Sequence, residues 1–372
     1  MTVLTRFGMA AIMAAASFAA SAENITPNLK FNGFGTASVG VLDDDQGGQY
    51  IKPLGNDLGL NQSANASLES LIGLQFDYAL NDQVNMVAQL VAQGSNNYEV
   101  NAEWAYIGYA IDDNWRLRGG RFALPSFMFS ETIHVGQSYP WVRLPAEVYF
   151  GVPVTNFDGA DMLFRHPIGS WNLNAQILAG GSNTDYFRTQ NAIGANISLS
   201  NDNLTLRAGY IGSQLTLNST DIVPDYLCSL LCLDQERNQL SNVGALYDDG
   251  KWFLAGEFAQ LKVNGWVSDY NSGYLSAGYY FGKLLPFALW STVHTFNEEE
   301  CTSNPACAVP SNYKDQTTMA LGARYALKNN VSVKGQIDHV SGFNNSTGLL
   351  SNPDQTPPDN FNVFTLSLNA AF

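Results

Sequence analysis

The feature that most constrains this sequence is a period-two alternation of apolar and polar residues that recurs along most of its length. Between residues 71 and 80, every second side chain is apolar, and small or polar residues lie between them. Equivalent runs occupy 84–92, 171–179, 193–199, 204–210, 319–327 and 331–337. Because successive side chains of a strand point to opposite faces, the pattern predicts β-strands with one apolar and one polar face. Runs of roughly 10 residues are long enough to cross a bilayer when tilted.

The connections between these runs alternate between short and long. Short polar turns are expected near Asp82, Asp113, Ile168, Asn201, Asp249, Lys283 and Asn329. Longer segments lie at 43–66, 95–98, 124–156, 182–190, 214–238, 264–270, 298–315 and 343–359. Seven turns and eight loops join about sixteen strands, which predicts an all-β protein, a closed antiparallel transmembrane β-barrel with a water-filled interior. Closure leaves no strand edge unpaired, as lipid requires.

The first residues and the charge balance limit the location and the partners. Residues 1–22 contain one basic side chain, an apolar run and small residues at the end, which predicts a cleaved signal peptide and a mature barrel over 23–372. Asp and Glu total 33 against 18 Lys and Arg, for a formal net charge of −15. This balance argues against a nucleic-acid partner, which would require a basic face.

The C-terminus, FNVFTLSLNAAF, places apolar residues on one face and ends on Phe372. It resembles the closing strand of Gram-negative outer-membrane porins. The segments FNGFGTASVGV, GGRFALPSF, YPWVRLPAEVY and FDGADMLFR are similar to porins of the same superfamily. The resemblance implies a channel in the bacterial outer membrane for passive diffusion of small hydrophilic solutes. It also implies that the outer-membrane assembly machinery reads Phe372 and that the chain forms a homotrimer.

By the same resemblance, segment 124–156 is the loop that folds into the barrel and narrows it. The basic and acidic residues expected at this constriction are Arg116, Arg118, Arg121, Glu131, Arg143, Glu147, Arg207, Arg324 and Lys334. Arginines on the wall opposite loop carboxylates would set a transverse field across a narrow passage, with a weak preference for anions. The alternative is that these arginines form salt bridges along the wall or bind loop carbonyls.

Four cysteines lie in two of the long segments. Cys228 and Cys232 share one segment, and Cys301 and Cys307 share another. Export to an oxidising compartment favours two disulfides within the loops, although a cross-link between the loops is also open. No histidine stands near either pair, which argues against a metal site.

The remaining alternatives concern the loops. The acidic runs Asp43–Asp45 and Glu298–Glu300 are either a solvated rim or ligands for divalent cations that bridge lipopolysaccharide phosphates. A barrel enzyme would need a catalytic group at the rim, where His134 with Glu131 is the one loop candidate. These features therefore favour a porin without cofactor or metal over a solute-selective channel, a barrel enzyme or a surface receptor.

Overall fold

The structure is a computed structural model of the chain. It describes residues 23–43, 49–51, 59–150, 154–184, 187–217, 233–264, 269–296, 314–344, 346–351 and 359–372. The expected signal peptide, the four cysteines and the run Glu298–Glu300 lie outside the described residues. Among the helices that are described, none has the length and apolar character needed to cross a membrane.

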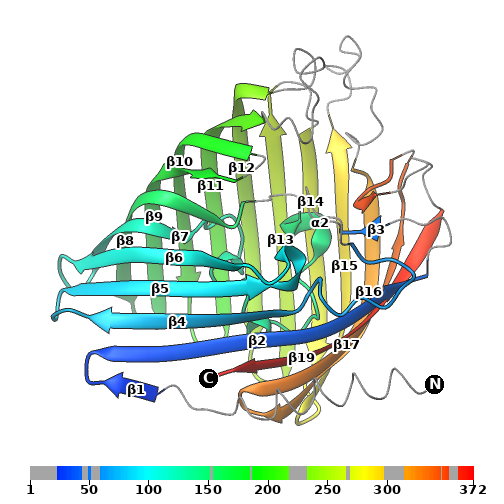
Figure 1. The fold of residues 1–372 in the computed structure, drawn as a ribbon, viewed down its shortest axis with the longest axis horizontal. Helices are drawn as coiled ribbons and strands as arrows, with labels where there is room; N and C mark the ends of the chain where they lie inside the picture. The colour runs from blue at the N-terminus through cyan, green and yellow to red at the C-terminus, as the bar shows by residue number, and fades with distance from the viewer. Residues whose placement is uncertain are drawn as a thin grey trace.

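Sixteen strands form a closed antiparallel barrel, as the alternation predicted (Figure 1). They are β2 (Leu29–Leu42), β4 (Leu71–Ala79), β5 (Val84–Gln93), β6 (Val100–Ala110), β7 (Trp115–Ala123), β8 (Asn156–Ile168), β9 (Trp171–Asn183), β10 (Phe187–Ser200), β11 (Leu204–Leu217), β12 (Leu233–Asp248), β13 (Trp252–Val263), β14 (Asp269–Tyr279), β15 (Leu284–Phe296), β16 (Gln316–Lys328), β17 (Val331–Ser341) and β19 (Asn360–Ala371). A short strand, β1 (Glu23–Thr26), pairs with the start of β2. Two further short strands, β3 (Gln49–Tyr50) and β18 (Leu350–Ser351), pair with each other outside the barrel sheet.

The seven short turns lie at one end of the barrel, where they were predicted. Four of them use the same device, in which an Asn or Asp side chain accepts hydrogen bonds from the backbone N–H groups two and three residues later. The residues are Asn81, Asp112, Asn201 and Asp249. These side chains fix the turn geometry because they replace backbone partners that a tight reversal leaves unpaired.

The barrel closes where the last strand meets the first long one. β19 pairs with β2 from Val363 opposite Leu42 to Ala371 opposite Phe34. Beyond β19, the N–H of Phe372 donates to the carbonyl of Gly33 at 2.8 Å and the N–H of Gly33 donates back at 2.9 Å. A Cβ at Gly33 would lie 2.2 Å from the Phe372 ring, so the ring takes the space that a side chain at this position would fill. The terminal aromatic ring thus packs over the closing seam.

The two faces of the strands differ as expected for a membrane barrel. Ile193 and Ile197 of β10 point outward with 68% and 50% of their surface exposed. Between them, Asn196 points into the lumen and donates to Gln176 of β9 at 2.7 Å. Aromatic side chains near the short turns are exposed on the outer face at Tyr78, Trp115, Trp252, Phe281 and Tyr325. Their position is typical of the girdle at a membrane interface.

The strand β6, whose residues 104–109 are apolar on both faces, contains a β-bulge. Gln89 of β5 pairs with Trp104, but the next residue, Leu90, pairs with Ala102, so Glu103 is the extra residue. The bulge turns Glu103 into the lumen, where its carboxylate accepts from the side chain of Asn156 at 3.0 Å. One inserted residue therefore breaks the alternation that the sequence pattern depends on.

A pair of substitutions tests the assignment of the two faces. We expect Ile197→Arg to destabilise the barrel by about 2 kcal/mol, because it places a charge in lipid. Ser198→Arg places the same charge one residue further along in the aqueous lumen and should be tolerated. Urea unfolding in lipid vesicles, followed by tryptophan fluorescence, measures both. Equal costs for the two variants would contradict the assignment.

Candidate pore constriction

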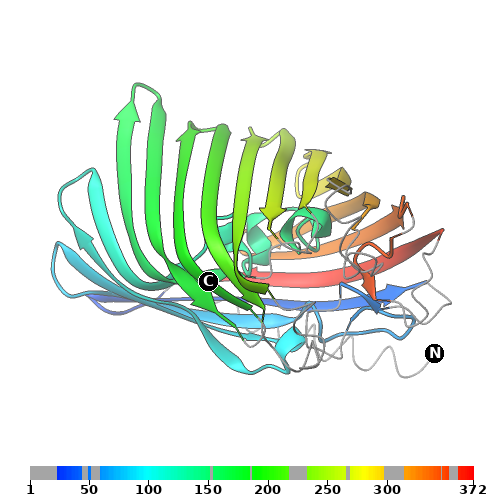
Figure 2. The same cartoon turned by 90° about the horizontal axis from the view of Figure 1, so that it is seen from above.

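The segment between β7 and β8 turns into the barrel and crosses its interior. It contains two 3-10 turns, η2 (Ser130–Thr132) and η3 (Gly136–Ser138), and one short helix, α2 (Ala146–Tyr149). We call residues 124–155, apart from the undescribed 151–153, the inward loop. Its helix packs against β14 and β15 and lies between opposite walls of the barrel (Figures 1 and 2).

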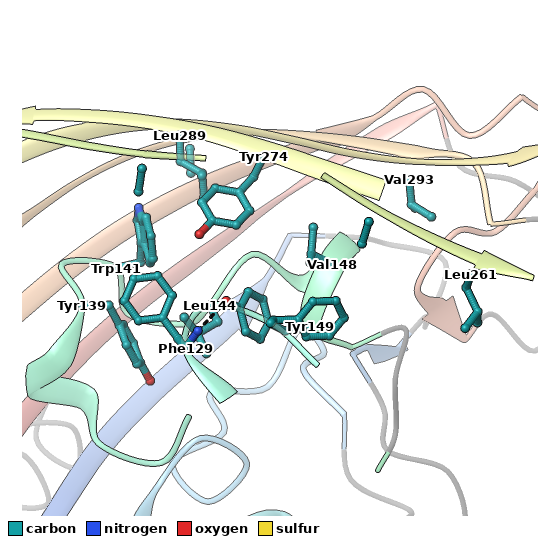
Figure 3. Packing of buried hydrophobic residues seen from close by; sticks show 14 of the residues in the cluster. Phe129, Tyr139, Trp141, Leu144, Val148, Tyr149, Leu261, Tyr274, Leu289 and Val293 are labelled. Carbon is teal, nitrogen blue, oxygen red and sulfur yellow. Dashed lines mark hydrogen bonds between the residues drawn. The ribbon is translucent and has the colours of Figure 1, made fainter. Parts of the chain in front are cut away.

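The inward loop is held first by an apolar contact. Phe127, Phe129, Tyr139, Trp141, Leu144, Val148 and Tyr149 of the loop pack against lumen-facing side chains of β12–β16. Figure 3 shows Tyr274 and Leu289 of that wall beside the loop aromatics. Trp141 is fully buried at the centre, and its indole N–H donates to Ser276 at 2.9 Å. The lumen face of this wall therefore carries a large apolar patch, contrary to the expected polar face, because protein rather than water covers it.

One lysine and one arginine of the wall donate hydrogen bonds to oxygen atoms of the inward loop. Lys334 of β17 is fully buried and donates to the carbonyls of Gly136 at 2.5 Å and Trp141 at 2.7 Å. Arg324 of β16 donates to the side-chain oxygen of Gln137 at 2.7 Å. Both cations satisfy loop oxygens, which is the alternative role considered from the sequence, and neither has a carboxylate partner in the described residues.

Arg143 joins the inward loop to the part of the wall where β19 and β2 close the barrel. Its guanidinium forms ion pairs with Glu69, in the segment before β4, and with Asp338 of β17. It also donates to the hydroxyl of Thr365 in β19. Burial acts to lower the pKa of Arg143, but the charges of Glu69 and Asp338 raise it, so the guanidinium stays charged. Arg143 thus acts as an anchor and does not face the passage as expected.

Two buried carboxylates complete the attachment. Glu147 of α2 accepts from Ser291 and Gln316 at 2.6 Å each, so it also serves as an anchor and not as an exposed constriction charge. Glu257 of β13 accepts from the backbone N–H of Met128 at 2.7 Å and from the hydroxyl of Tyr149 at 2.6 Å. Burial, followed by the charge of Glu257, raises the pKa of Tyr149, which keeps that hydroxyl protonated as a donor.

The wall that the inward loop leaves uncovered carries the remaining lumen charges. Arg118 of β7 donates through Nε to Asp161 of β8 at 3.0 Å and stacks over the rings of Tyr106 and Phe122. Its partner is therefore a wall carboxylate, not the loop carboxylate that was expected. Arg116, two residues earlier on the same face, is exposed and forms no ion pair within the described residues.

Arg121 does not line the lumen, and this corrects its expected position. It lies three residues after Arg118, so its side chain points to the outer face with Leu117. There it pairs with Asp158 of β8 at 2.7 Å. Gly120, with φ of 134°, precedes it and allows the close approach of β6, since a Cβ there would lie 2.3 Å from the carbonyl oxygen of Ala105. Odd spacing decides the face, as the strand geometry requires.

Two further expected residues lie at the edge of the passage. Glu131 is exposed on η2 and lies within electrostatic range of Arg118 and Arg207. Arg207 of β11 donates to the carbonyl of Pro125, where the inward loop begins, at 2.5 Å. Arg165 of β8 directly follows the outward Phe164, so it lies on the lumen face, as the strand alternation predicts. Its Nε donates to Asn174 at 3.0 Å.

Comparison with known proteins agrees with this architecture. Residues 8–345 match the family described as Gram-negative porin. The chain belongs to the Gram-negative porin family. No curated protein matches the porin's sequence closely. Among solved structures, it is similar to Salmonella typhi OmpF in complex with daunomycin, with 12% identity, 95% and 100% of the two chains covered, and a TM-score of 0.61.

Two other solved structures share the fold of this porin. An anion-selective porin from Comamonas acidovorans is 14% identical over 92% of this chain and 99% of its own, with a TM-score of 0.61. The outer-membrane expressed OmpT of Vibrio cholerae is 12% identical over 95% and 100% of the chains, with a TM-score of 0.59. Family and fold identify an outer-membrane channel for passive diffusion and point away from an enzyme. Within the described ranges, no group of three His, Cys, Asp or Glu side chains could hold a metal ion.

The anchoring role of Arg143 can be tested in this porin. We expect Arg143→Gln to lower the free energy of unfolding by about 3 kcal/mol, because it leaves Glu69 and Asp338 buried without a cation. Arg116→Gln removes an exposed arginine from the same lumen and should leave stability unchanged. Urea unfolding in vesicles measures both variants. An unchanged midpoint for Arg143→Gln would show that its ion pairs do not hold the loop.

Proposed function

We propose that this porin is a general diffusion channel with a weak preference for anions. The passage runs between the inward loop and the wall formed by β4–β11. The observation that carries the proposal is the set of lumen arginines Arg116, Arg165 and Arg207, which have no carboxylate in an ion pair within the described residues. Their charge acts on ions in the passage, whereas the charge of Arg118 is balanced by Asp161.

The physical reason is the difference between paired and unpaired charges in a confined aqueous path. Low-dielectric walls concentrate the field of an unpaired charge into the water between them. A cation that contacts a carboxylate, as Arg118 does at Asp161, gives only a short-ranged dipole. Glu131 on the loop weakens the positive field without removing it, which accounts for a weak rather than a strong preference.

The finer features of the chain are proposed on sequence grounds and on the family. Residues 1–22 direct export, and the assembly machinery of the outer membrane reads Phe372. The mature chain forms a homotrimer that contacts lipid and lipopolysaccharide; one neighbour, in-vitro folded OmpT of Vibrio cholerae, is described as a trimer. The pairs Cys228–Cys232 and Cys301–Cys307 form disulfides within their loops.

Reversal potentials in planar bilayers under a dilute KCl gradient test the selectivity. A unit charge about 10 Å from an ion in water contributes roughly 0.4 kcal/mol, so Arg116→Gln should change the permeability of anion and cation roughly twofold each, in opposite directions. Arg207→Gln should act in the same sense. A cation-selective wild type, or no shift in either variant, would contradict the proposal.

Arg121→Gln is the matched control. It removes an arginine from the same strand, β7, but from the outer face, where Asp158 is its partner. Its reversal potential should equal that of the wild type. Swelling of liposomes loaded with neutral sugars of increasing size tests the alternative of a solute-selective channel, which would admit one solute class far faster than others of equal size.

A further inference from the structure

The outer face of the barrel carries the same two-residue device on two strands. In β10, Arg188 is followed by Gln190, and in β12, Arg237 is followed by Gln239. When the amides are turned so that oxygen faces the guanidinium, Gln190 accepts from Nη2 of Arg188 at 3.1 Å and Gln239 accepts from Nη2 of Arg237 at 3.0 Å. Each arginine is thus oriented by a neutral amide that leaves its charge intact.

Strand register joins the two devices into one row. Gln190 lies opposite Gln214 of β11, and Gln214 lies opposite Arg237. Across the next pair of strands, Gln239 lies opposite Lys262 of β13. The side chain of Asn191, which lies within the shift of register in β10, donates to Gln214 at 2.6 Å. We call Arg188, Gln190, Gln214, Arg237, Gln239 and Lys262 the outer basic row.

The position of the outer basic row along the membrane normal follows from the same strands. Towards the short turns, β10–β13 expose apolar side chains on this outer face, among them Ile193, Tyr210, Val243 and Phe258 at 68%, 43%, 53% and 50% of their surface. The row lies beyond them, at the ends of β10–β13 that adjoin the long loops. In outer-membrane barrels the long loops face the cell exterior, so the row lies at the level of the outer-leaflet headgroups.

The charge of the row is not cancelled in the described residues. Arg188, Arg237 and Lys262 are exposed, and none forms an ion pair there. Lys262 lies 6.0 Å from the centre of the Phe296 ring. On the next strand, β14, the Oδ1 of Asp269 accepts the N–H of Val263 at 2.8 Å.

Further round the same rim, β7 and β8 carry a self-neutralised pair, Arg121 with Asp158. The row is therefore a local positive surface on a chain with a formal net charge of −15.

We propose that the outer basic row binds the phosphate groups of outer-leaflet glycolipid. The glutamine oxygen takes the Nε–Nη2 edge of each guanidinium, which leaves the Nη1–Nη2 end to meet phosphate oxygens, and Lys262 adds a point charge beside them. The apolar side chains directly below the row would contact the acyl chains of the same lipid. The inference rests on the lipid partnership proposed above and assigns it to β10–β13, in contrast to the acidic rim considered from the sequence.

The test compares lipid binding by purified porin in detergent, measured by native mass spectrometry with diphosphorylated lipid A and with dephosphorylated lipid A of the same acyl chains. The wild type should retain the phosphorylated lipid preferentially. The triple variant Arg188→Gln, Arg237→Gln, Lys262→Gln should lose this preference, by roughly fivefold for each cation removed. Equal retention of the two lipids by the wild type would overturn the proposal.

The matched control is Lys251→Gln, Lys283→Gln, Lys328→Gln, which removes three exposed cations from the short-turn end. It should bind as the wild type does; an equal loss would reduce the effect to net charge and overturn the site. Full displacement of the lipid by inorganic phosphate would assign the row to free phosphate instead. If the triple variant does not fold, Arg237→Gln alone is measured in the same way and should reduce the preference for the phosphorylated lipid about fivefold.

Conductance in planar bilayers separates this inference from the proposed channel function. Since the row lies outside the lumen, the triple variant should conduct and select ions as the wild type does. A wild-type porin that does not conduct but still prefers the phosphorylated lipid would count against the channel proposal and leave the lipid site standing.

Discussion

Lipid offers no hydrogen-bond partner to a backbone, and this requirement governs the whole chain. A sheet in a bilayer must close on itself, so the last strand has to find the first in register. Here β19 and β2 meet, and Phe372 and Gly33 exchange backbone hydrogen bonds beyond the end of β19. The missing side chain of Gly33 admits the terminal ring. The outward apolar alternation is then a consequence of closure, because every strand has one face towards lipid and one towards an enclosed space.

The enclosed space is divided unequally between water and protein. The wall of β12–β16 carries an apolar patch on its lumen side, and the aromatic residues of the inward loop cover this patch and form one cluster with it. The opposite wall is lined by arginines, amides and carboxylates. Apolar burial holds the loop, and buried polar contacts from Arg143, Glu147, Glu257 and Lys334 fix its register. Water is left only where the lining is polar.

The sequence predicts the strands and turns well because both signals are local. Alternation acts over neighbouring residues, and the Asn or Asp of each turn bonds within three residues. The roles of charged residues are harder to predict, because they depend on partners far away in the chain. Arg143 and Asp338 are separated by 195 residues, and nothing near Arg143 indicates that it is buried. A β-bulge turns Glu103 into the lumen, and no feature of the neighbouring sequence predicts this bulge. The outward position of Arg121, in contrast, follows from its odd spacing from Arg118 along the same strand.

The same reasoning explains which arginines can influence ions. Confinement favours pairing, since a cation that leaves water needs a carboxylate or carbonyl to replace it. Arg143 and Lys334 meet this need under the loop, and Arg118 meets it along the wall with Asp161. Arg116 remains exposed to water and has no such need. The residues that hold the inward loop are therefore mostly different from those that act on the solute, although Arg207 also binds the start of the loop. A substitution can alter selectivity without loosening the loop only at an arginine that water, rather than protein, already solvates.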